Sequence, residues 1–296
     1  MTSIPSINDS KRLVIKVGSS LLLKKNEFHF NWLDSLIDDI IFLRKKKIEL
    51  VLVISGAVSL GKKYLNFTNK VLKLNTKQAC AACGQVILMK NFLSSFKKKK
   101  LKVAQILLTY SDTEDRRKSL NSKETINTLI ESNVIPVINE NDTVATEELK
   151  FGDNDRLASR VAQIFGAKSL ILLSDVDGLY SKNPKNFPKA KLIPIVKEIN
   201  KEIFKMASSE TNQFGSGGME TKIHAAEIAK SFGCNTLICS GKSKNPISKY
   251  LKTQKGTWFL SRKKNESNFK NWLAGTINVS GSLTIDQGAL NAILKG

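Results

Sequence analysis

The 296-residue chain has few of the residues on which several kinds of chemistry depend. It contains two histidines and four cysteines, and neither histidine lies near a cysteine in sequence, so a mixed zinc site is not indicated. No stretch approaches the ~20 apolar residues that a membrane-spanning helix requires. The first residues, MTSIPSINDSKR, also lack the basic-then-apolar pattern of a signal peptide. We therefore expect a cytoplasmic protein with no membrane partner.

The cysteines include one C-x-x-C pair, Cys80 and Cys83, a spacing that is compatible with a metal knuckle or a redox site. The surrounding sequence, KQACAACGQVILM, is instead typical of a buried helix of small residues. Inert core thiols in a reducing compartment are therefore favoured, and no metal site is predicted.

Positive charge is abundant, but arginine is scarce. The formal net charge is +21, and only seven of the 47 basic residues are arginine. Proteins that bind nucleic acids usually rely on arginine, and the lysines here are scattered along the chain. A solvated, lysine-rich surface is favoured, and nucleic-acid binding is the alternative from a different functional class. The positive field would also attract small anionic substrates.

Buried strands and helices are predicted to alternate along the chain. The strands are continuous apolar runs: RLVIKVGSS, ELVLVISGA, LKVAQILL, VIPVINEND, KSLILLSDVDGLY and CNTLICSG. Helices are expected between them, for example over residues 30–46 and 75–96. This alternation predicts an α/β fold, a three-layer sandwich with a mostly parallel central sheet. Because most of these strands end in small polar residues, a ligand site is expected at the carboxyl edge of the sheet.

Two common phosphate-binding fingerprints are missing. The SGKS stretch at residues 240–243 imitates the end of a P-loop, but Thr236 stands where its first glycine should be, and no G-x-G-x-x-G follows the first strand. The sequence FGSGGMETKIHAA instead leads three glycines into a helix that carries Lys222, and the backbone N–H groups of such a start bind anions. A second lysine, Lys16, lies near the end of the first strand. Burying its ammonium group there is costly unless the group reaches a negative charge. Two lysines and glycine-rich loops suit phosphoryl transfer, which depends on positioning and charge neutralisation.

Seven motifs resemble those of the amino acid kinase family. In chain order they are VIKVGSS, VISGAVSLG, KQACAACGQ, INENDTV, FGDNDRLASRVA, LLSDVDGLY and GSGGMETKIHAA, between about residues 12 and 260. The resemblance is to members that act on free glutamate. It implies transfer of the γ-phosphoryl group of ATP, with Mg²⁺, to the glutamate side-chain carboxylate, the first step of proline biosynthesis. Members that phosphorylate N-acetylglutamate, aspartate, carbamate or uridylate are the alternatives.

The resemblance also assigns roles to individual residues. Lys16 and Lys222 would be catalytic, with Asp155 orienting them. Glutamate would be held by Ser55, Asp142 and Asn154. The ATP-binding residues would be Lys16, Ser174, Asp175, Ser216, Gly217, Gly218, Met219, Glu220, Thr221 and Lys222. The family commonly has threonine where Ser174 and Ser216 stand, and serine retains the hydroxyl.

The GDND turn at residues 152–155 is acidic although the chain is strongly basic. A substrate with an ammonium group needs hydrogen-bond acceptors, and Asp142, Asp153 and Asn154 supply them. We therefore interpret this turn as part of the α-amino subsite, with one of its aspartates also capping the following helix.

The resemblance implies partners as well. Proline, the end product of the pathway, would act as a feedback inhibitor at or beside the glutamate site. A homo-oligomer is expected, with hand-over of the labile product to glutamyl phosphate reductase. Residues 1–260 would form the kinase domain. Residues 261–296 would be a connector followed by GSLTIDQGALNAILKG, a truncated or vestigial segment that resembles the start of a PUA domain and is too short to form one.

Overall fold

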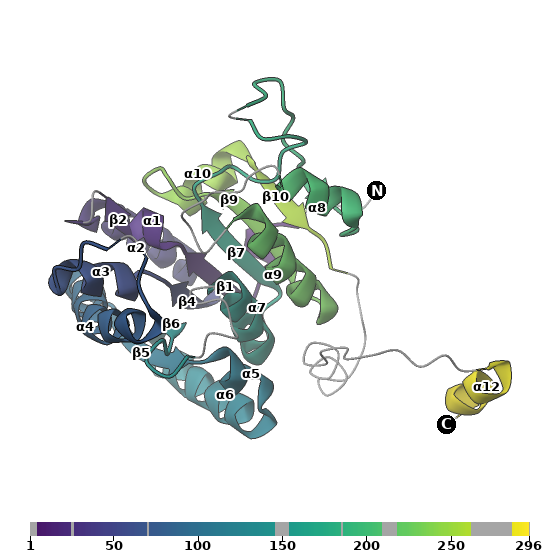
Figure 1. The fold of residues 1–296 in the computed structure, drawn as a ribbon, viewed down its shortest axis with the longest axis horizontal. Helices are drawn as coiled ribbons and strands as arrows, with labels where there is room; N and C mark the ends of the chain where they lie inside the picture. The colour runs from purple at the N-terminus through teal and green to yellow at the C-terminus, as the bar shows by residue number, and fades with distance from the viewer. Residues whose placement is uncertain are drawn as a thin grey trace.

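The structure is a computed structural model, and it describes residues 5–24, 27–69, 71–145, 154–184, 186–208, 218–261 and 286–295. Its centre is an eight-stranded sheet with helices on both faces (Figure 1). The strands are β1 (Arg12–Val17), β4 (Glu49–Ile54), β5 (Lys102–Leu108), β6 (Val134–Glu140), β7 (Ser169–Ser174), β8 (Ile195–Val196), β9 (Asn235–Ser240) and β10 (Gly256–Phe259).

The sheet order is β5-β6-β4-β1-β7-β9-β10-β8, and every neighbouring pair is parallel except β9 and β10. The predicted three-layer fold with a mostly parallel sheet is therefore confirmed. A separate antiparallel pair, β2 (Leu23–Lys24) and β3 (Glu27–Phe28), follows the first helix.

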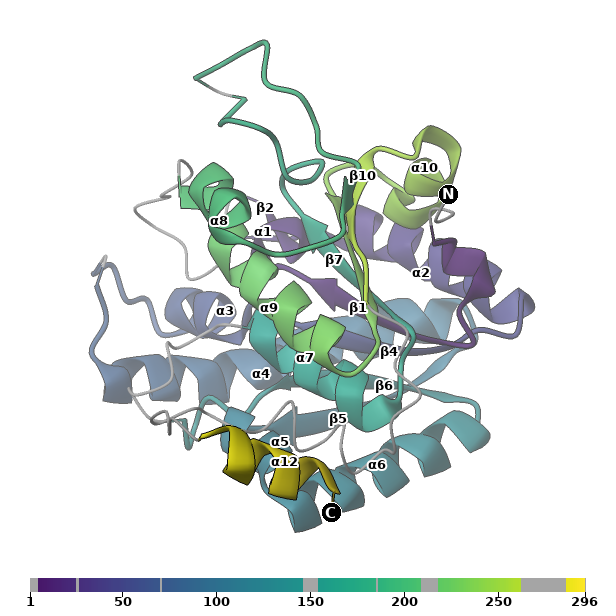
Figure 2. The ribbon, with the colours of Figure 1, turned by 90° about the vertical axis from the view of Figure 1, so that its right-hand side faces the viewer.

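Helices cover the two faces of the sheet as separate layers, as Figure 2 shows. One layer contains α2 (Phe30–Lys45), α4 (Leu74–Lys98) and α10 (Pro246–Thr253), and the other contains α6 (Arg116–Glu131), α7 (Asn154–Phe165) and α9 (Met219–Ser231). The remaining helical elements are η1 (Ile7–Asp9), α1 (Ser19–Leu22), α3 (Ala57–Tyr64), α5 (Tyr110–Glu114), α8 (Lys201–Ser208) and α12 (Gln287–Lys295).

Strand β1 shows how the sheet separates the two layers. Leu13 and Ile15 belong to the core under α2 and α4, whereas Val14 belongs to the core under α7 and α9. Because side chains alternate along a strand, Lys16 lies on the same face as Val14. The lysine therefore enters the layer that contains α7 and α9.

Helices α3 and α4 touch backbone to backbone. A Cβ atom at Gly84 would overlap the carbonyl oxygen of Ala57, and one at Gly61 would overlap that of Cys80. This contact explains the small residues of KQACAACGQ. Cys80 is buried within it, and burial raises the pKa of its thiol. Among the residues that the structure describes, all four cysteines are free, and no group of three or more His, Cys, Asp or Glu could hold a metal.

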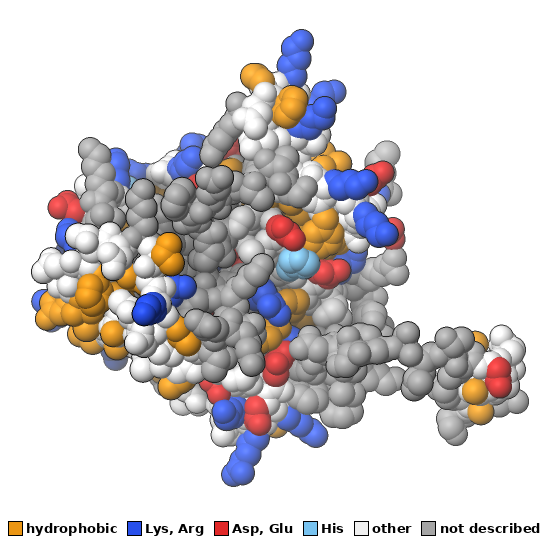
Figure 3. Space-filling view, viewed as in Figure 1, with side chains coloured by type: hydrophobic (Ala, Val, Ile, Leu, Met, Phe, Trp, Pro, Cys, Tyr) orange, Lys and Arg blue, Asp and Glu red, His pale blue; other side chains and the backbone are white. Residues whose placement is uncertain are grey.

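Basic side chains are spread over the molecule rather than gathered in one patch on the face seen in Figure 3. The same face has exposed apolar side chains over α3 and α4. The exposed large apolar residues on and between these two helices are Tyr64, Phe67, Val71, Val86 and Leu93. None of the described helices is long and apolar enough to cross a membrane.

The C-terminal helix α12 stands apart from the sheet (Figure 1), and the described side chains of residues 286–292 are exposed. Most of the predicted connector and the start of the PUA-like segment lie outside the described residues.

Candidate active site

Asp155, at the start of α7, lies between two lysines. Its Oδ1 is 2.6 Å from Nζ of Lys16, and its Oδ2 is 3.0 Å from Nζ of Lys222. The three residues are only 1%, 7% and 6% exposed, respectively. Burial acts to raise the pKa of Asp155, but the two ammonium groups outweigh it and hold that pKa well below its usual value. The trio thus combines two ammonium groups with one permanent carboxylate, a net positive charge suited to an anion.

Three separate elements bring the trio together: the end of β1, the first turn of α7 and the first turn of α9. Thr221 adds a third contact to Asp155, since its hydroxyl donates to Oδ2 of Asp155 at 3.0 Å. Gly18 follows β1, and a Cβ there would come within 4.0 Å of the Lys16 ammonium. Glycine at this position therefore leaves space beside the charged group.

Helix α9 begins with Met219 after Gly218, which provides no side-chain cap. Its first N–H groups are therefore available to an anion. The predicted nucleotide residues Gly218, Met219, Glu220, Thr221 and Lys222 form this start of the helix. Ser216 and Gly217 lie outside the described residues.

The end of β7 supplies the other predicted nucleotide residues. Ser174 is buried, and its hydroxyl donates to Oδ1 of Asp175 at 3.3 Å. Asp175 itself is exposed. Because β7 lies beside β1 in the sheet, both residues emerge at the same edge as Lys16.

A chain of polar side chains begins at Asn154, next to Asp155. The Nδ2 atom of Asn154 lies 2.8 Å from Oγ of Ser55, 3.1 Å from the carbonyl oxygen of Ile54 and 3.3 Å from Oδ1 of Asn139. Asn139 in turn donates from Nδ2 to Oε1 of Gln85 at 2.7 Å. We call Gln85, Asn139 and Asn154 the amide chain. It links α4, β6 and α7.

Asp142 follows β6 and has a different environment from Asp155. It is 8% exposed, and burial together with the charge of Glu140 raises its pKa to about 7. This carboxyl group therefore changes its charge near neutral pH.

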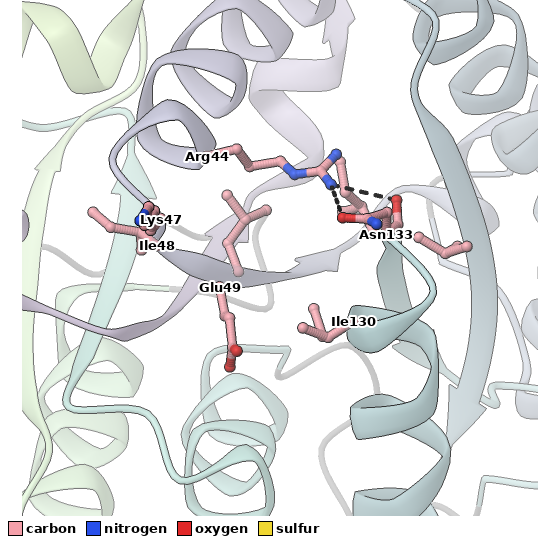
Figure 4. Close-up of a pocket in the computed structure, with 9 residues that line it drawn as sticks. Arg44, Lys47, Ile48, Glu49, Ile130 and Asn133 are labelled. Atoms are coloured by element: carbon pink, nitrogen blue, oxygen red, sulfur yellow. Dashed lines mark hydrogen bonds between the residues drawn. The ribbon is translucent and has the colours of Figure 1, made fainter.

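A pocket elsewhere in the molecule contains none of the predicted site residues. Its lining includes Arg44 in the last turn of α2, Glu49 at the start of β4 and Asn133 just before β6 (Figure 4). The Arg44 guanidinium donates to the carbonyl oxygen of Asn133 at 3.4 Å. The pocket therefore lies at the amino-terminal ends of these strands, on the opposite edge of the sheet from the lysine–aspartate trio.

Comparison with protein families gives a match to the model described as the amino acid kinase family over residues 11–240. The chain belongs to the amino acid kinase family.

Curated relatives of this amino acid kinase are closely similar over almost its whole length. A protein named glutamate 5-kinase from Pelagibacter ubique is 47% identical over 291 residues, which cover 98% of this chain and 79% of that protein. The glutamate 5-kinase of Bartonella henselae is 46% identical over 97% of this chain and 76% of its own length.

Solved structures show the same fold at lower identity. UMP kinase from Ureaplasma parvum has a TM-score of 0.57 and 18% identity, covering 85% of this chain and 99% of its own. Carbamate kinase from Giardia lamblia bound to AMP-PNP has a TM-score of 0.57 and 17% identity, covering 86% of this chain and 100% of its own.

The structure of this amino acid kinase joins the predicted site residues in two groups. Lys16, Lys222 and Asp155 form the trio, and Ser55 contacts Asn154 beside it. Asp153 and the rest of residues 146–153 lie outside the described residues.

The sequence interpretation did not assign roles to Asn139 and Gln85. Both lie within quoted motifs, INENDTV and KQACAACGQ. Buried amides commonly serve as helix caps or as core hydrogen-bonding groups, so the sequence alone does not single out Asn139 and Gln85. Only the contact that they make between β6 and α4 does so.

Proposed function

We propose that this amino acid kinase transfers the γ-phosphoryl group of ATP to the side-chain carboxylate of L-glutamate, giving γ-glutamyl phosphate, the first intermediate of proline biosynthesis. The observation that carries the proposal is the buried Lys16–Asp155–Lys222 trio. The relatives named glutamate 5-kinase, at 46–47% identity, support free glutamate as the substrate.

The reaction needs no general base from the protein. A glutamate side chain has a pKa of about 4.3, so its carboxylate is already ionised at neutral pH. One of its oxygens forms a bond to the γ-phosphorus, while the bond from that phosphorus to the bridging oxygen breaks and its electron pair leaves with ADP. Asp155 is held ionised between two ammonium groups and so cannot serve as the proton acceptor.

The two lysines stabilise the transferred group. Charge spreads over the equatorial oxygens of the γ-phosphoryl group in the transition state, and fixed cations beside them lower the barrier. Lys16 and Lys222 supply those cations from opposite sides of Asp155, which sets their separation. The start of α9 and the end of β7 then take the remaining phosphates and the nucleotide.

Mg²⁺ fits this site as a companion of ATP. Mg²⁺ is usually held by substrate phosphates with one or two carboxylates and several waters, and a dedicated protein cage is not required. The described residues contain no such cage, and Asp175 is the exposed carboxylate nearest in sequence to the predicted nucleotide residue Ser174. The ion would neutralise phosphate charge.

The amino-acid end of glutamate belongs beside Ser55, Asn154 and Asp142. Oδ1 of Asn154 is buried and has no hydrogen-bond partner among the described residues. This oxygen is an acceptor for the substrate ammonium, and Asp142 supplies the complementary negative charge when it is ionised.

The test is ADP release measured with a coupled assay on glutamate, N-acetylglutamate, aspartate and UMP. Turnover with glutamate and little with the others is expected. Turnover only with UMP or only with N-acetylglutamate would refute the proposal and select another activity of the family.

Proline is proposed as a feedback inhibitor at or beside the glutamate subsite. The stretch that motivates this, TEELKFGD at residues 146–153, lies outside the described residues. Titration of proline at fixed glutamate should inhibit the enzyme competitively, and absence of inhibition at millimolar proline contradicts the assignment.

A homo-oligomer is proposed because Tyr64, Val86 and Leu93, which are 65%, 71% and 51% exposed, leave an apolar surface on α3 and α4. Sedimentation of the purified chain tests this. We further assign the enzyme to the cytoplasm, with glutamyl phosphate reductase as the acceptor of its labile product.

A further inference from the structure

The orientation of each side chain in the amide chain is fixed by one backbone group. The carbonyl oxygen of Ile54 can only accept, so the Asn154 atom 3.1 Å from it must be the nitrogen Nδ2. The Asn139 atom that faces this nitrogen must then be Oδ1, and Nδ2 of Asn139 faces Gln85. The Gln85 atom in that contact must therefore be Oε1, which leaves Nε2 as a donor at the end of the chain.

The two ends of this chain are left without partners. Nε2 of Gln85 and Oδ1 of Asn154 are both shielded from water and make no hydrogen bond to the residues that the structure describes. Buried polar groups in folded proteins are nearly always hydrogen-bonded, so an unpaired donor and an unpaired acceptor in one site require an explanation. A ligand that brings one acceptor and one donor provides it.

Gln85 lies beside the predicted substrate site. Its neighbour Gly84 contacts the carbonyl oxygen of Ala57, two residues after Ser55. The amide chain runs from Asn154, which adjoins Asp155, through Asn139 to Gln85. Asn139 and Asn154 therefore stand between Gln85 and Asp155 along this path, and Asp155 in turn binds the two lysines.

With its reacting carboxylate at the lysines, as the proposed function requires, glutamate would extend its main-chain groups toward the amide chain. We propose that Nε2 of Gln85 donates a hydrogen bond to the α-carboxylate of the amino-acid substrate. This proposal rests on the proposed function. It makes Gln85 a determinant of specificity for a substrate with a main-chain carboxylate.

The variant Gln85→Glu separates this role from support of Asn139. The new side chain has the same shape and still accepts from Nδ2 of Asn139, but it has no N–H donor when ionised. Because a hydrogen bond to a charged group is lost, the KM for glutamate should rise roughly 10- to 100-fold. The KM for ATP and the unfolding temperature should change little.

Two further variants make the result specific. Asn91→Asp puts the same new charge on α4, six residues away and outside the amide chain, and should leave the KM for glutamate within about twofold, as for an ordinary surface change. Gln85→Met removes both the donor and the acceptor and should also raise the KM. A normal KM in Gln85→Glu with a raised KM in Gln85→Met would show that Gln85 only supports Asn139, and would overturn the proposal.

The deciding probe is 4-aminobutanoate, which is glutamate without its α-carboxylate. The inhibition constant of 4-aminobutanoate, measured in competition with glutamate, should be the same for the wild type and for Gln85→Glu. Glutamate itself should bind the variant more weakly. If Gln85→Glu weakened the binding of glutamate and 4-aminobutanoate equally, or weakened the binding of neither compound, the assignment would be overturned. The wild-type control separates the two claims, because a wild type that does not phosphorylate glutamate refutes the proposed function whatever the variants do.

Discussion

Asp155 and Asp142 lie at the same edge of the sheet and are both buried, with 1% and 8% of their surface exposed. Their pKa values nevertheless move in opposite directions. Asp155 is held well below its usual pKa, and Asp142 is raised to about 7. Burial alone raises the pKa of a carboxyl group, so the neighbouring charges decide the difference.

Each neighbourhood indicates a different use of a carboxylate. Lys16 and Lys222 keep Asp155 ionised, so in the proposed function it is a fixed part of the centre that stabilises the transferred charge. Burial, together with the charge of Glu140, makes ionisation of Asp142 unfavourable, so its charge depends on pH and, in the proposed function, on the substrate ammonium. The proposed site would therefore combine one carboxylate that is always ionised with one whose ionisation depends on pH.

The largest effect is expected when one of the two cations beside Asp155 is removed. Lys222→Ala should lower kcat by about 10³-fold or more, because a cation beside the transferred phosphoryl group is lost. Asp155 keeps Lys16 and Thr221 as partners, so we expect little change in folding. Steady-state kinetics and thermal unfolding measure both quantities. Lys90→Ala, on the exposed side of α4, is the control, and a near-normal kcat in Lys222→Ala would remove this residue from the mechanism.

Asp142→Asn tests the conditional carboxylate. The KM for glutamate should rise about tenfold or more through loss of a charged partner for the ammonium, with a far smaller effect on the KM for ATP. Asp142→Ala should act in the same sense. The Asn variant should also unfold at a higher temperature at pH 8, because it no longer buries an ionised carboxylate beside Glu140. Equal effects on both substrates would place Asp142 outside the amino-acid subsite.

The pH dependence sharpens the same contrast. With a pKa of about 7, Asp142 is mostly protonated at pH 6 and mostly ionised at pH 8, so the KM for glutamate should fall roughly tenfold across that range. The profile of Asp142→Asn should be flat. A pH-independent KM in the unaltered enzyme would contradict the role of this carboxyl group.

The two carboxyl groups also affect stability with opposite signs. The pKa of Asp142 is higher in the folded chain than the unfolded value of about 3.9, so its contribution lowers stability as pH rises from about 4 to about 7. Asp155 has a lowered pKa, so its contribution is present at neutral pH and is lost as the solution is acidified below about pH 4.

The smallest effect is expected at the C-terminus. The predicted catalytic residues lie between Lys16 and Lys222, and the side chains of residues 286–292 in the separate helix α12 are exposed. Deletion of residues 278–296 should leave the KM for glutamate and for ATP within a few-fold. Lost catalysis in a truncated chain that still folds would show that the tail completes the site.

The long elements of the fold could be predicted from the sequence because their patterns are strong. Helix α2 was expected over residues 30–46 and α4 over residues 75–96, and the structure has Phe30–Lys45 and Leu74–Lys98. Strand β10, with the four residues GTWF, was not predicted, nor was its antiparallel pairing with β9. Such a short run carries little periodicity, and pairing depends on distant partners.

Most residues of the candidate site could be predicted from the sequence, but most of the contacts between them could not. The residues of the trio follow from the family resemblance, but their ion pairs are seen only in the structure. Gln85 and Asn139 are 54 positions apart, and neither motif indicates that they touch. Asp142 was expected beside the ammonium group, whereas its raised pKa depends on burial that a sequence does not show.

The backbone contact between α3 and α4 has a consequence for motion. Two helices that touch through glycine have no side chains between them to rearrange, so they move as one rigid body. Ser55 and Gly56 precede α3 directly, and Gln85 adjoins Gly84 on α4. Any closure of the enzyme around its substrate would therefore carry the serine turn and the glutamine together and preserve their spacing.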